Sequence, residues 1–318
     1  IKGEQAHSEL QRICTANIKN EIGRSTYTQM LNEAGGIETD LTVICIDKYC
    51  FRIISSAATR THDKAHIMKH LSSDIEFNDI TDDLVCLGIF GPKSRNLISK
   101  ISNDDFTNEL FKFGYGKFVT LGSKKVWAQR LSYVGELGFE IYINNKDAKD
   151  IYQLIVKEGK NHNLSHCGSH AMDTMRMESG FLHWGHDISP EENQYEAGLN
   201  FAISYKKKTN FIGKKNLLKI KDKKQNRRLI ILSLIDSKPG KPLLLHEEPI
   251  YLKDKIIGRT TSANYSFNYK KNLSFGYVNS VYSNEELSKM ELYIEVAKQK
   301  YPAMVELTNL KDKQAKLL

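Results

Sequence analysis

The apolar pattern changes character near residue 225, and this change constrains the fold more than any other feature of the sequence. Before it, strand-like and helical spacings alternate: 41–55 predicts two strands around a turn at Asp47-Lys48, and 61–71 predicts an amphipathic helix. After it, LIILSLI, PIYLKDKIIGRTTS, LSFGYV and ELYIEVAKQKYPAMVEL are strand-like, without a long helical pattern. The sequence therefore predicts an α+β part followed by a small β-barrel.

The α+β part repeats strand and helix signals. LVCLGIFG (84–91) predicts a short buried strand, and 92–101 predicts a helix that begins with proline in its first turn. Strands around a glycine-rich bend are expected over 124–144. Further helices are expected over 147–160 and 170–180, the second with a glycine just past its end.

Length and composition limit the class of protein. The 318 residues argue for two or three packed units, and 40% apolar with 26% charged residues is typical of a globular chain. No stretch has the ~18 consecutive apolar residues of a membrane-spanning helix, and the first residues lack a signal-peptide layout. Because Ile1-Lys2-Gly3 resembles the end of a strand entering a turn, we expect the chain to begin inside a larger protein.

Cysteine and charge point to a reducing compartment and to no nucleic acid. The five cysteines include no CxxC pair, so we expect buried core thiols: Cys14, Cys45, Cys50, Cys86 and Cys167. Segment 205–228 carries eleven Lys or Arg and one acid, which accounts for the whole excess of the +8 chain. Its spacing forms no helical stripe, and it has few aromatics for base stacking. We interpret it as a solvated basic linker, with a contact to an anionic ligand tail or to nucleic acid as the alternatives.

Two other kinds of site are disfavoured. Neither GxGxxG nor GxxxxGK[ST] occurs, so the chain itself should not bind FAD, NAD or ATP through such loops. Two histidine series at a spacing of four residues, 62/66/70 and 162/166/170, could each line one helical face as a metal site does. Their surroundings favour surface or capping roles, and we assign no metal.

GGIETDLTV (35–43) holds a candidate catalytic group. Two glycines permit a tight turn, and Asp40 then lies at the start of an apolar strand, where a carboxylate is costly without a partner. Such a carboxylate can orient a ligand amine or take its proton. A turn-capping role for Asp40 is the structural alternative.

YVGELGFE (133–140) places Tyr133, Glu136 and Glu140 around a glycine bend. A carboxylate that faces a pocket can hold a pair of N–H donors, such as the amino-pyrimidinone edge of a pterin. The bend between Gly135 and Gly138 prevents a firm assignment of which side chain faces which way.

These residues carry a family resemblance. YVGELGFEIY resembles the Y-T-G-E-x-G-[FYW]-E signature of the glycine-cleavage T-protein (aminomethyltransferase) superfamily. Four other blocks resemble it in order along the chain: 26–43, 181–203, 210–217 and 258–278. Within it, GGI-x-x-DLTV and Ala171-Met172 are most similar to the folate-binding C-terminal half of dimethylglycine and sarcosine dehydrogenases. Met172 stands where T-proteins usually carry a folate-site arginine.

The resemblance implies a three-part cloverleaf that binds tetrahydrofolate: two α/β lobes within 1–204, a linker over 205–224 and a β-barrel over 225–318. It implies that Asp40 lies near the reacting folate nitrogens and that the other site positions are Tyr133, Glu140, Glu136, Thr42 and Arg176. Gln194, where relatives often have proline, and Ala263-Asn264, in place of T-S-G, depart from the family and affect loop conformation.

The implied function is formation of 5,10-methylenetetrahydrofolate from an N-methyl-derived imine or formaldehyde. FAD is then expected in an upstream domain, and the location is the cytoplasm, or the mitochondrial matrix of a eukaryote. One alternative is a stand-alone aminomethyltransferase or a folate-dependent demethylase. Another, of a different class, is a folate-binding regulatory protein without catalysis. No membrane or nucleic-acid partner is expected.

Overall fold

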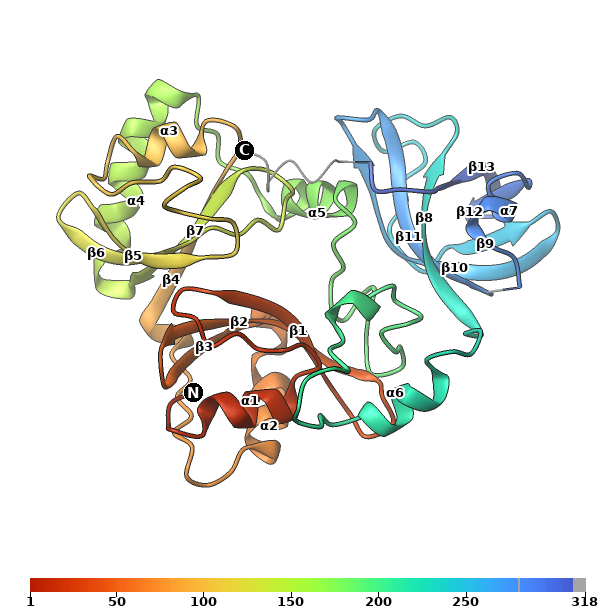
Figure 1. Cartoon of the computed structure of the whole chain (residues 1–318). Helices are drawn as coiled ribbons and strands as arrows, with labels where there is room; N and C mark the ends of the chain where they lie inside the picture. Colours follow the sequence, from red (N-terminus) through yellow and green to blue (C-terminus); the bar gives the residue numbers. More distant parts are fainter. Residues whose placement is uncertain (280, 311–318) are drawn as a thin grey trace.

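Within residues 1–279 and 281–310, which the computed structural model describes, the strands form three groups. One is a three-stranded sheet, the second a four-stranded sheet and the third a closed barrel. In Figure 1 the three-stranded sheet lies at the bottom, the four-stranded sheet at the upper left and the barrel at the upper right. The predicted α+β fold of two lobes and a C-terminal barrel is confirmed.

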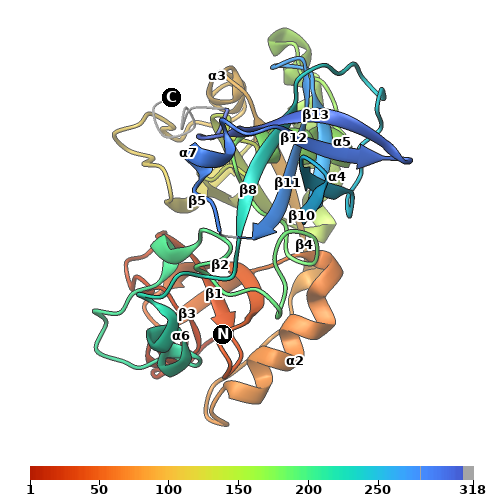
Figure 2. The ribbon, with the colours of Figure 1, turned by 90° about the vertical axis from the view of Figure 1, so that its right-hand side faces the viewer.

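The first lobe is built on an antiparallel sheet of, in order, β1 (Ser25–Leu31), β2 (Ile37–Asp47) and β3 (Cys50–Ile54). The turn between β2 and β3 lies at the predicted position. Side chains alternate along β2, so Leu41, Val43 and Cys45 join the buried core of this lobe. The lobe also includes α1 (Ala6–Ile13) and α2 (Arg60–His70), and Figure 2 shows α2 along one side of it, below the barrel.

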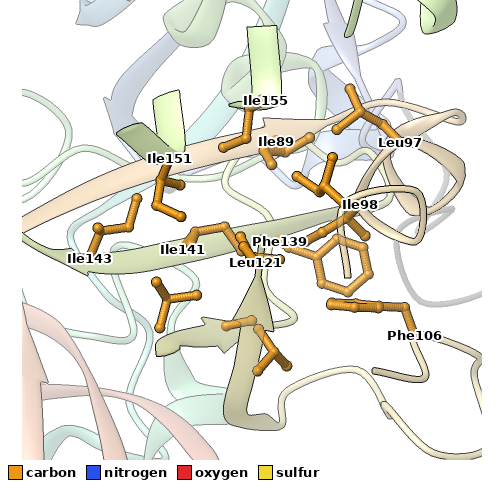
Figure 3. Close-up of a cluster of buried hydrophobic side chains, with 14 of the residues drawn as sticks. Ile89, Leu97, Ile98, Phe106, Leu121, Phe139, Ile141, Ile143, Ile151 and Ile155 are labelled. Carbon is orange, nitrogen blue, oxygen red and sulfur yellow. The ribbon is translucent and has the colours of Figure 1, made fainter. Parts of the chain in front are cut away.

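The second lobe contains an antiparallel sheet in the order β4 (Leu84–Phe90), β7 (Gly138–Asn144), β6 (Lys124–Gln129) and β5 (Gly116–Leu121). Its helices are α3 (Ser94–Ile98) and α4 (Asn145–Gly159). Figure 3 shows its core, in which Phe139, Ile141 and Ile143 of β7 gather with Ile151 and Ile155 of α4. The other face of β7 is therefore free to border the first lobe.

The barrel closes in the order β10 (Lys255–Ser266), β11 (Lys271–Asn279), β8 (Arg227–Leu234), β13 (Gln299–Glu306), β12 (Leu292–Val296) and β9 (Pro249–Leu252). A short helix, α7 (Asn284–Leu287), precedes β12, and Leu287 is buried in the barrel core. Closure pairs every strand on both sides and leaves no open sheet edge.

A further buried cluster joins the first lobe, α5 (Ser169–Glu178) and the barrel. It combines Leu31 and Ile37 of the first lobe with Met177 and with Phe275 of the barrel. In chain order, α5 and α6 (Lys214–Ile220) come between the second lobe and the barrel, and Leu217 of α6 belongs to this cluster. Short 3-10 turns complete the described elements: η1 (Ala57–Thr59), η2 (Thr81–Asp83), η3 (Lys160–His162) and η4 (Asn200–Ala202).

Some local predictions are wrong. The helix predicted over 92–101 is reduced to α3, which ends at Ile98, and the chain beyond it is fixed by a bond from the Gly122 backbone nitrogen in the β5–β6 turn to the oxygen of Ile101. The strand predicted as buried, β4, lies at a sheet edge, and Ile89 is its one buried residue. Cys86 and Cys167 are exposed rather than in the core, because one lies on this edge strand and the other in a loop.

The basic segment is not solvated throughout. Lys207 is buried, and its Nζ donates to the backbone oxygens of Gln11, at 2.7 Å, and Ala16, at 3.0 Å. These oxygens belong to the end of α1 and the turn after it, where backbone carbonyls lack helical partners. Lys206 and Lys208 on either side are exposed. A solvated role therefore fits the neighbours of Lys207 but is wrong for Lys207 itself.

Candidate functional site

A small apolar cluster lies where the sheets of the two lobes meet. Ile44 of β2 packs in a buried cluster with Trp127 of β6 and Tyr142 of β7. Because side chains two residues apart share a strand face, Asp40 and Thr42 lie on the face of β2 that carries Ile44. By the same rule, Glu140 lies on the face of β7 that carries Tyr142. The predicted residues of the two lobes thus border the same region between the sheets.

Asp40 is held by a neutral hydrogen-bond donor. Gln29 is its cross-strand neighbour on β1, and Gln29 Nε2 donates to Asp40 Oδ1 at 2.8 Å. Burial raises the pKa of Asp40 to about 6, against hydrogen bonds from Gln29 and Tyr27 that lower it. A carboxylate with this pKa is mostly ionised at neutral pH but takes up a proton readily, which suits proton transfer.

Aromatic rings surround Asp40. Tyr27 stacks on Phe201 with ring centres 6.2 Å apart, and Tyr133 stacks on Phe181 with ring centres 6.1 Å apart. Burial is the main reason that the pKa of Tyr27 is well above its usual value, and the neighbouring Asp40 raises it further. Phe201 is 73% exposed, so part of this aromatic surface is open to a ligand.

Tyr133, a predicted folate-site residue, is fixed in the bend before β7. Its hydroxyl donates to the backbone oxygen of Leu182 at 2.9 Å. Burial raises the pKa of Tyr133 to about 12, so its hydroxyl stays protonated as a donor over the physiological range. The backbone nitrogen of Glu136, in the same bend, donates to Ser132 Oγ at 3.2 Å.

Glu140 has one oxygen occupied and another available. Tyr142 Oη donates to Glu140 Oε2 at 2.6 Å, and both side chains lie on the inter-lobe face. Burial raises the pKa of Glu140, which the Tyr142 hydrogen bond partly offsets. No described residue donates a hydrogen bond to Oε1. The carboxylate can therefore accept N–H groups of a ligand that enters between the lobes.

Arg176 is buried among protein partners. Its Nη1 donates to Asp187 Oδ2 at 2.6 Å, and its Nη2 donates to Ser262 Oγ of β10 at 2.8 Å. Its Nε also donates to Asp173 Oδ1 at 2.7 Å. Its guanidinium thus ties α5 to the barrel, and the folate contact predicted for it stays a prediction.

Several neighbours of the predicted residues carry no signal in the sequence pattern. Gln29 and Tyr27 lie on β1, which the coarse pattern did not identify, and Phe201 lies in a 3-10 turn about 160 residues beyond Asp40. The cross-strand pairing of Gln29 with Asp40 places this glutamine at the site, and that register comes from the structure, because no local pattern encodes it.

Two members of the histidine series, His62 and His166, have ordinary side-chain partners. His62 Nε2 lies 3.2 Å from Glu38 Oε2, and Tyr152 Oη lies 2.9 Å from His166 Nε2. In the described part of the chain no group of three or more His, Cys, Asp or Glu residues is arranged to hold a metal ion. Likewise, no helix of that part is long and apolar enough to cross a membrane.

Family models match most of the chain. A model of the GCVT N-terminal domain matches residues 1–207, and a model of the glycine cleavage T-protein C-terminal barrel domain matches residues 227–312. Among solved structures, the glycine cleavage system aminomethyltransferase T from Bartonella henselae superposes with a TM-score of 0.84, covering 98% of this chain and 83% of that one. At 22% sequence identity, this likeness shows the shared fold.

Curated relatives are closer in sequence. Dimethylglycine dehydrogenase of Rattus norvegicus is 32% identical over 312 residues, 96% of this chain and 35% of that protein. The 4-methylaminobutanoate oxidase (formaldehyde-forming) of Paenarthrobacter nicotinovorans is 33% identical over 83% of this chain and 32% of that protein. An aminomethyltransferase of Listeria monocytogenes is 31% identical over 89% of this chain and 76% of that protein. The chain thus spans about a third of the length of the first two relatives.

Proposed function

Because the chain belongs to the glycine cleavage T-protein family, we propose that it is the tetrahydrofolate-dependent one-carbon transfer module of an enzyme related to dimethylglycine and sarcosine dehydrogenases. The reaction forms 5,10-methylenetetrahydrofolate from an N-methyl-derived imine or from formaldehyde. The observation that supports this proposal is that Asp40 on β2 and Glu140 on β7 lie on the two strand faces whose Ile44 and Tyr142 pack together.

Asp40 performs the proton handling in this proposal. A folate nitrogen that attacks an electrophilic carbon must be held in line and must lose its proton. Within the described chain, Asp40 is bonded to a neutral amide and forms no ion pair with Lys or Arg. Its basicity is therefore retained, and its pKa of about 6 leaves it ionised and ready at neutral pH.

Glu140 and the aromatic residues bind the ligand. The available Oε1 of Glu140 accepts from the amino-pyrimidinone edge of the pterin, while Tyr142 holds Oε2. The exposed ring of Phe201, stacked on Tyr27 beside Asp40, offers an apolar surface to the ring system of the folate. Thr42, Tyr133 and Glu136 border the same region, and we retain them as predicted folate contacts.

The one-carbon donor comes from a flavin domain in this proposal. The relatives that are about three times as long as this chain are named as dimethylglycine dehydrogenase and as a formaldehyde-forming oxidase. A covalently linked upstream domain with FAD oxidises the N-methyl amine, and this module captures the product. The location is then the mitochondrial matrix of a eukaryote or the cytoplasm of a bacterium.

A stand-alone aminomethyltransferase is the second candidate function. The Listeria monocytogenes protein named aminomethyltransferase is matched over 76% of its own length. The two functions share the folate site and differ in the donor. The complete reading frame upstream of Ile1 decides between them: an adjoining flavin domain supports the first, and a start codon directly before the chain supports the second.

Calorimetric titration with tetrahydrofolate and with FAD tests the shared part of both functions. We expect a folate signal and no FAD signal from the chain, because the dinucleotide glycine loops are missing from its sequence. Glu140→Gln provides a site-directed control that should weaken the folate signal. Tight FAD binding without a folate signal would overturn the proposal.

A further inference from the structure

Two buried glutamines connect Asp40 to a segment far away in the sequence. Gln29 Nε2 donates to Asp40 Oδ1 at 2.8 Å, and Gln194 Nε2 donates to Gln29 Oε1 at 2.5 Å. Both glutamines have 0% of their surface exposed. One continuous line of hydrogen bonds therefore ties the carboxylate on β2 to the loop that contains Gln194.

The direction of this line follows from the chemistry at its end. An ionised carboxylate can only accept hydrogen bonds, so Gln29 presents its nitrogen to Asp40 and its oxygen to Gln194. Gln194 must then present its own nitrogen, which also donates to Thr15 Oγ1 at 3.1 Å. If Asp40 takes a proton, both amides must turn over to keep the line, and the Gln194 nitrogen then occupies the buried position without a partner that its oxygen holds now, so the line fits the ionised carboxylate better.

Gln194, at the end of the line remote from Asp40, has an unsatisfied polar atom. Gln194 Oε1 is buried and has no hydrogen-bond partner, which is unfavourable for a polar atom away from water. An apolar side chain would fill this position without that penalty, so packing alone does not explain a glutamine here. The bond that Gln194 makes to Gln29, and through it to Asp40, supplies the compensating role.

We propose that Gln29 and Gln194 form an amide relay that orients the Asp40 carboxylate and favours its ionised form, which makes Gln194 a positioning residue for the one-carbon transfer. The link to the reaction rests on the proposed function. The link to the protonation of Asp40 does not, and it can be measured on the chain without any ligand.

Other ionisable groups also act on Asp40 and remain unchanged in the test. They come from the three elements packed around the carboxyl: Tyr27 on β1, Asp63 on α2 and Tyr133 in the bend before β7. The hydrogen bond from Tyr27 lowers the pKa of Asp40, and the charge of Asp63 raises it. Since the test variants keep all three groups, a shift in the pKa of Asp40 reports on the relay.

The test compares Gln29→Met, Gln194→Met and the double variant with the parental chain. Carbon-13 NMR follows the Asp40 carboxyl during a pH titration, with Asp40→Asn used to assign its resonance. We expect Gln29→Met to raise the pKa of Asp40 by about one unit, because a hydrogen bond to an ionised group is lost. Gln194→Met should raise it by about half as much. The double variant should match Gln29→Met, because both changes break one line.

A matched control separates the relay from the loss of any buried glutamine. Gln11 is also buried in the first lobe, and its amide bonds to Asn17 and Ile18 instead of to Asp40. Gln11→Met should leave the pKa of Asp40 unchanged. Gln29→Met probes the line from within the sheet, so the proposal remains testable if Gln194→Met does not fold.

The outcomes distinguish the relay from the proposed function. In the complete enzyme, the apparent pKa of the acidic limb of the pH–rate profile should rise in the variants in the same order as the NMR pKa of Asp40. In Gln194→Met, kcat should fall about 3- to 10-fold with little change in KM. An Asp40 pKa that stays constant in both single variants would overturn the relay alone. A shifted pKa in a parental enzyme that transfers no one-carbon unit would overturn the proposed function and leave the relay in place.

Discussion

Two aspartates of this molecule, Asp40 and Asp187, are shielded from solvent in different ways, with neutral partners in one case and a cation in the other. Asp187 is completely buried and receives donors on both oxygens: Arg176 Nη1 on Oδ2 and Thr261 Oγ1 on Oδ1, each at 2.6 Å. Asp40 is partly buried and is held by the neutral amide of Gln29. The first carboxylate has a guanidinium partner for its charge, and the second does not.

The difference teaches which carboxylate can react. An ion pair inside the protein fixes both partners, because removal of either leaves a buried charge without compensation. Asp187 therefore joins the 181–190 loop to α5 and the barrel. Asp40 keeps a pKa of about 6 because burial outweighs its neutral hydrogen bonds, so it can exchange a proton near neutral pH.

The Asp40→Ala variant is the most direct test of the difference between the two aspartates. In the complete enzyme, Asp40→Ala should lower the rate of one-carbon transfer about 10²- to 10⁴-fold, the usual contribution of a general base. Folate affinity should change far less, since proton handling matters chiefly in the transition state. Transfer rates and calorimetric folate titrations measure the two quantities. If Asp40→Ala transfers the one-carbon unit at the parental rate, Asp40 is a turn residue and no general base. If the parental protein binds folate but transfers no one-carbon unit, the result favours a regulatory folate binder.

Loss of the Asp187–Arg176 ion pair should lower the stability of the fold. Arg176→Met should lower the free energy of unfolding by about 3–5 kcal/mol, because it leaves Asp187 buried without its cation. Arg259→Met is the matched control: Arg259 pairs with Glu247 at 2.7 Å on an exposed surface, where a pair contributes only about 0–1 kcal/mol. Urea denaturation of both variants measures the difference. Weaker folate binding with unchanged stability in Arg176→Met would instead support the folate contact predicted for Arg176.

The sequence predicts local elements of both regions because their signals are local. The turn at Asp47-Lys48, the glycine bend before β7 and the helix around Arg176 are each encoded by a few neighbouring residues. Asp40 and Glu140 stand out because a carboxylate in an apolar strand is costly wherever the chain folds. The change in the apolar pattern near residue 225 predicts the barrel, and the family resemblance adds the division of the preceding part into two lobes.

Partners that are remote in sequence were not predictable in this way. Gln194 is 165 residues away from Gln29, and the sequence identified it only as a departure from proline. Lys207 resembled its exposed neighbours, yet it caps the carbonyls that follow α1 because the chain folds back against that helix. Both positions depend on tertiary packing, which a pattern of neighbours does not contain.

Glu140 is the second carboxylate of the proposed site, and the proposal gives it a binding role and no proton transfer. Glu140→Gln should weaken tetrahydrofolate binding about 10- to 150-fold, since a hydrogen bond to a charged group contributes about 1.5–3 kcal/mol. Turnover of bound folate should change little, because the contact exists in ground and transition states alike. Glu285→Gln, on exposed α7 of the barrel, is the control and should bind as the parent does. An unchanged dissociation constant for Glu140→Gln would move the pterin contact to Glu136.

The smallest expected effect is a pH-dependent gain in stability from Asp40→Asn. The pKa of Asp40 is about 6 in the folded state and about 4 in the unfolded state, so ionisation destabilises the fold as pH rises between these values. Asparagine removes this cost and should add about 1–2 kcal/mol to the free energy of unfolding at pH 7.5 relative to pH 4. Urea titrations at both pH values measure the gain, with the exposed Asp74→Asn as the control that should show none. If Asp40→Asn changes the free energy of unfolding equally at the two pH values, the pKa of Asp40 is not raised in the folded state. Asp40 would then differ from Asp187 only in its hydrogen-bond partners.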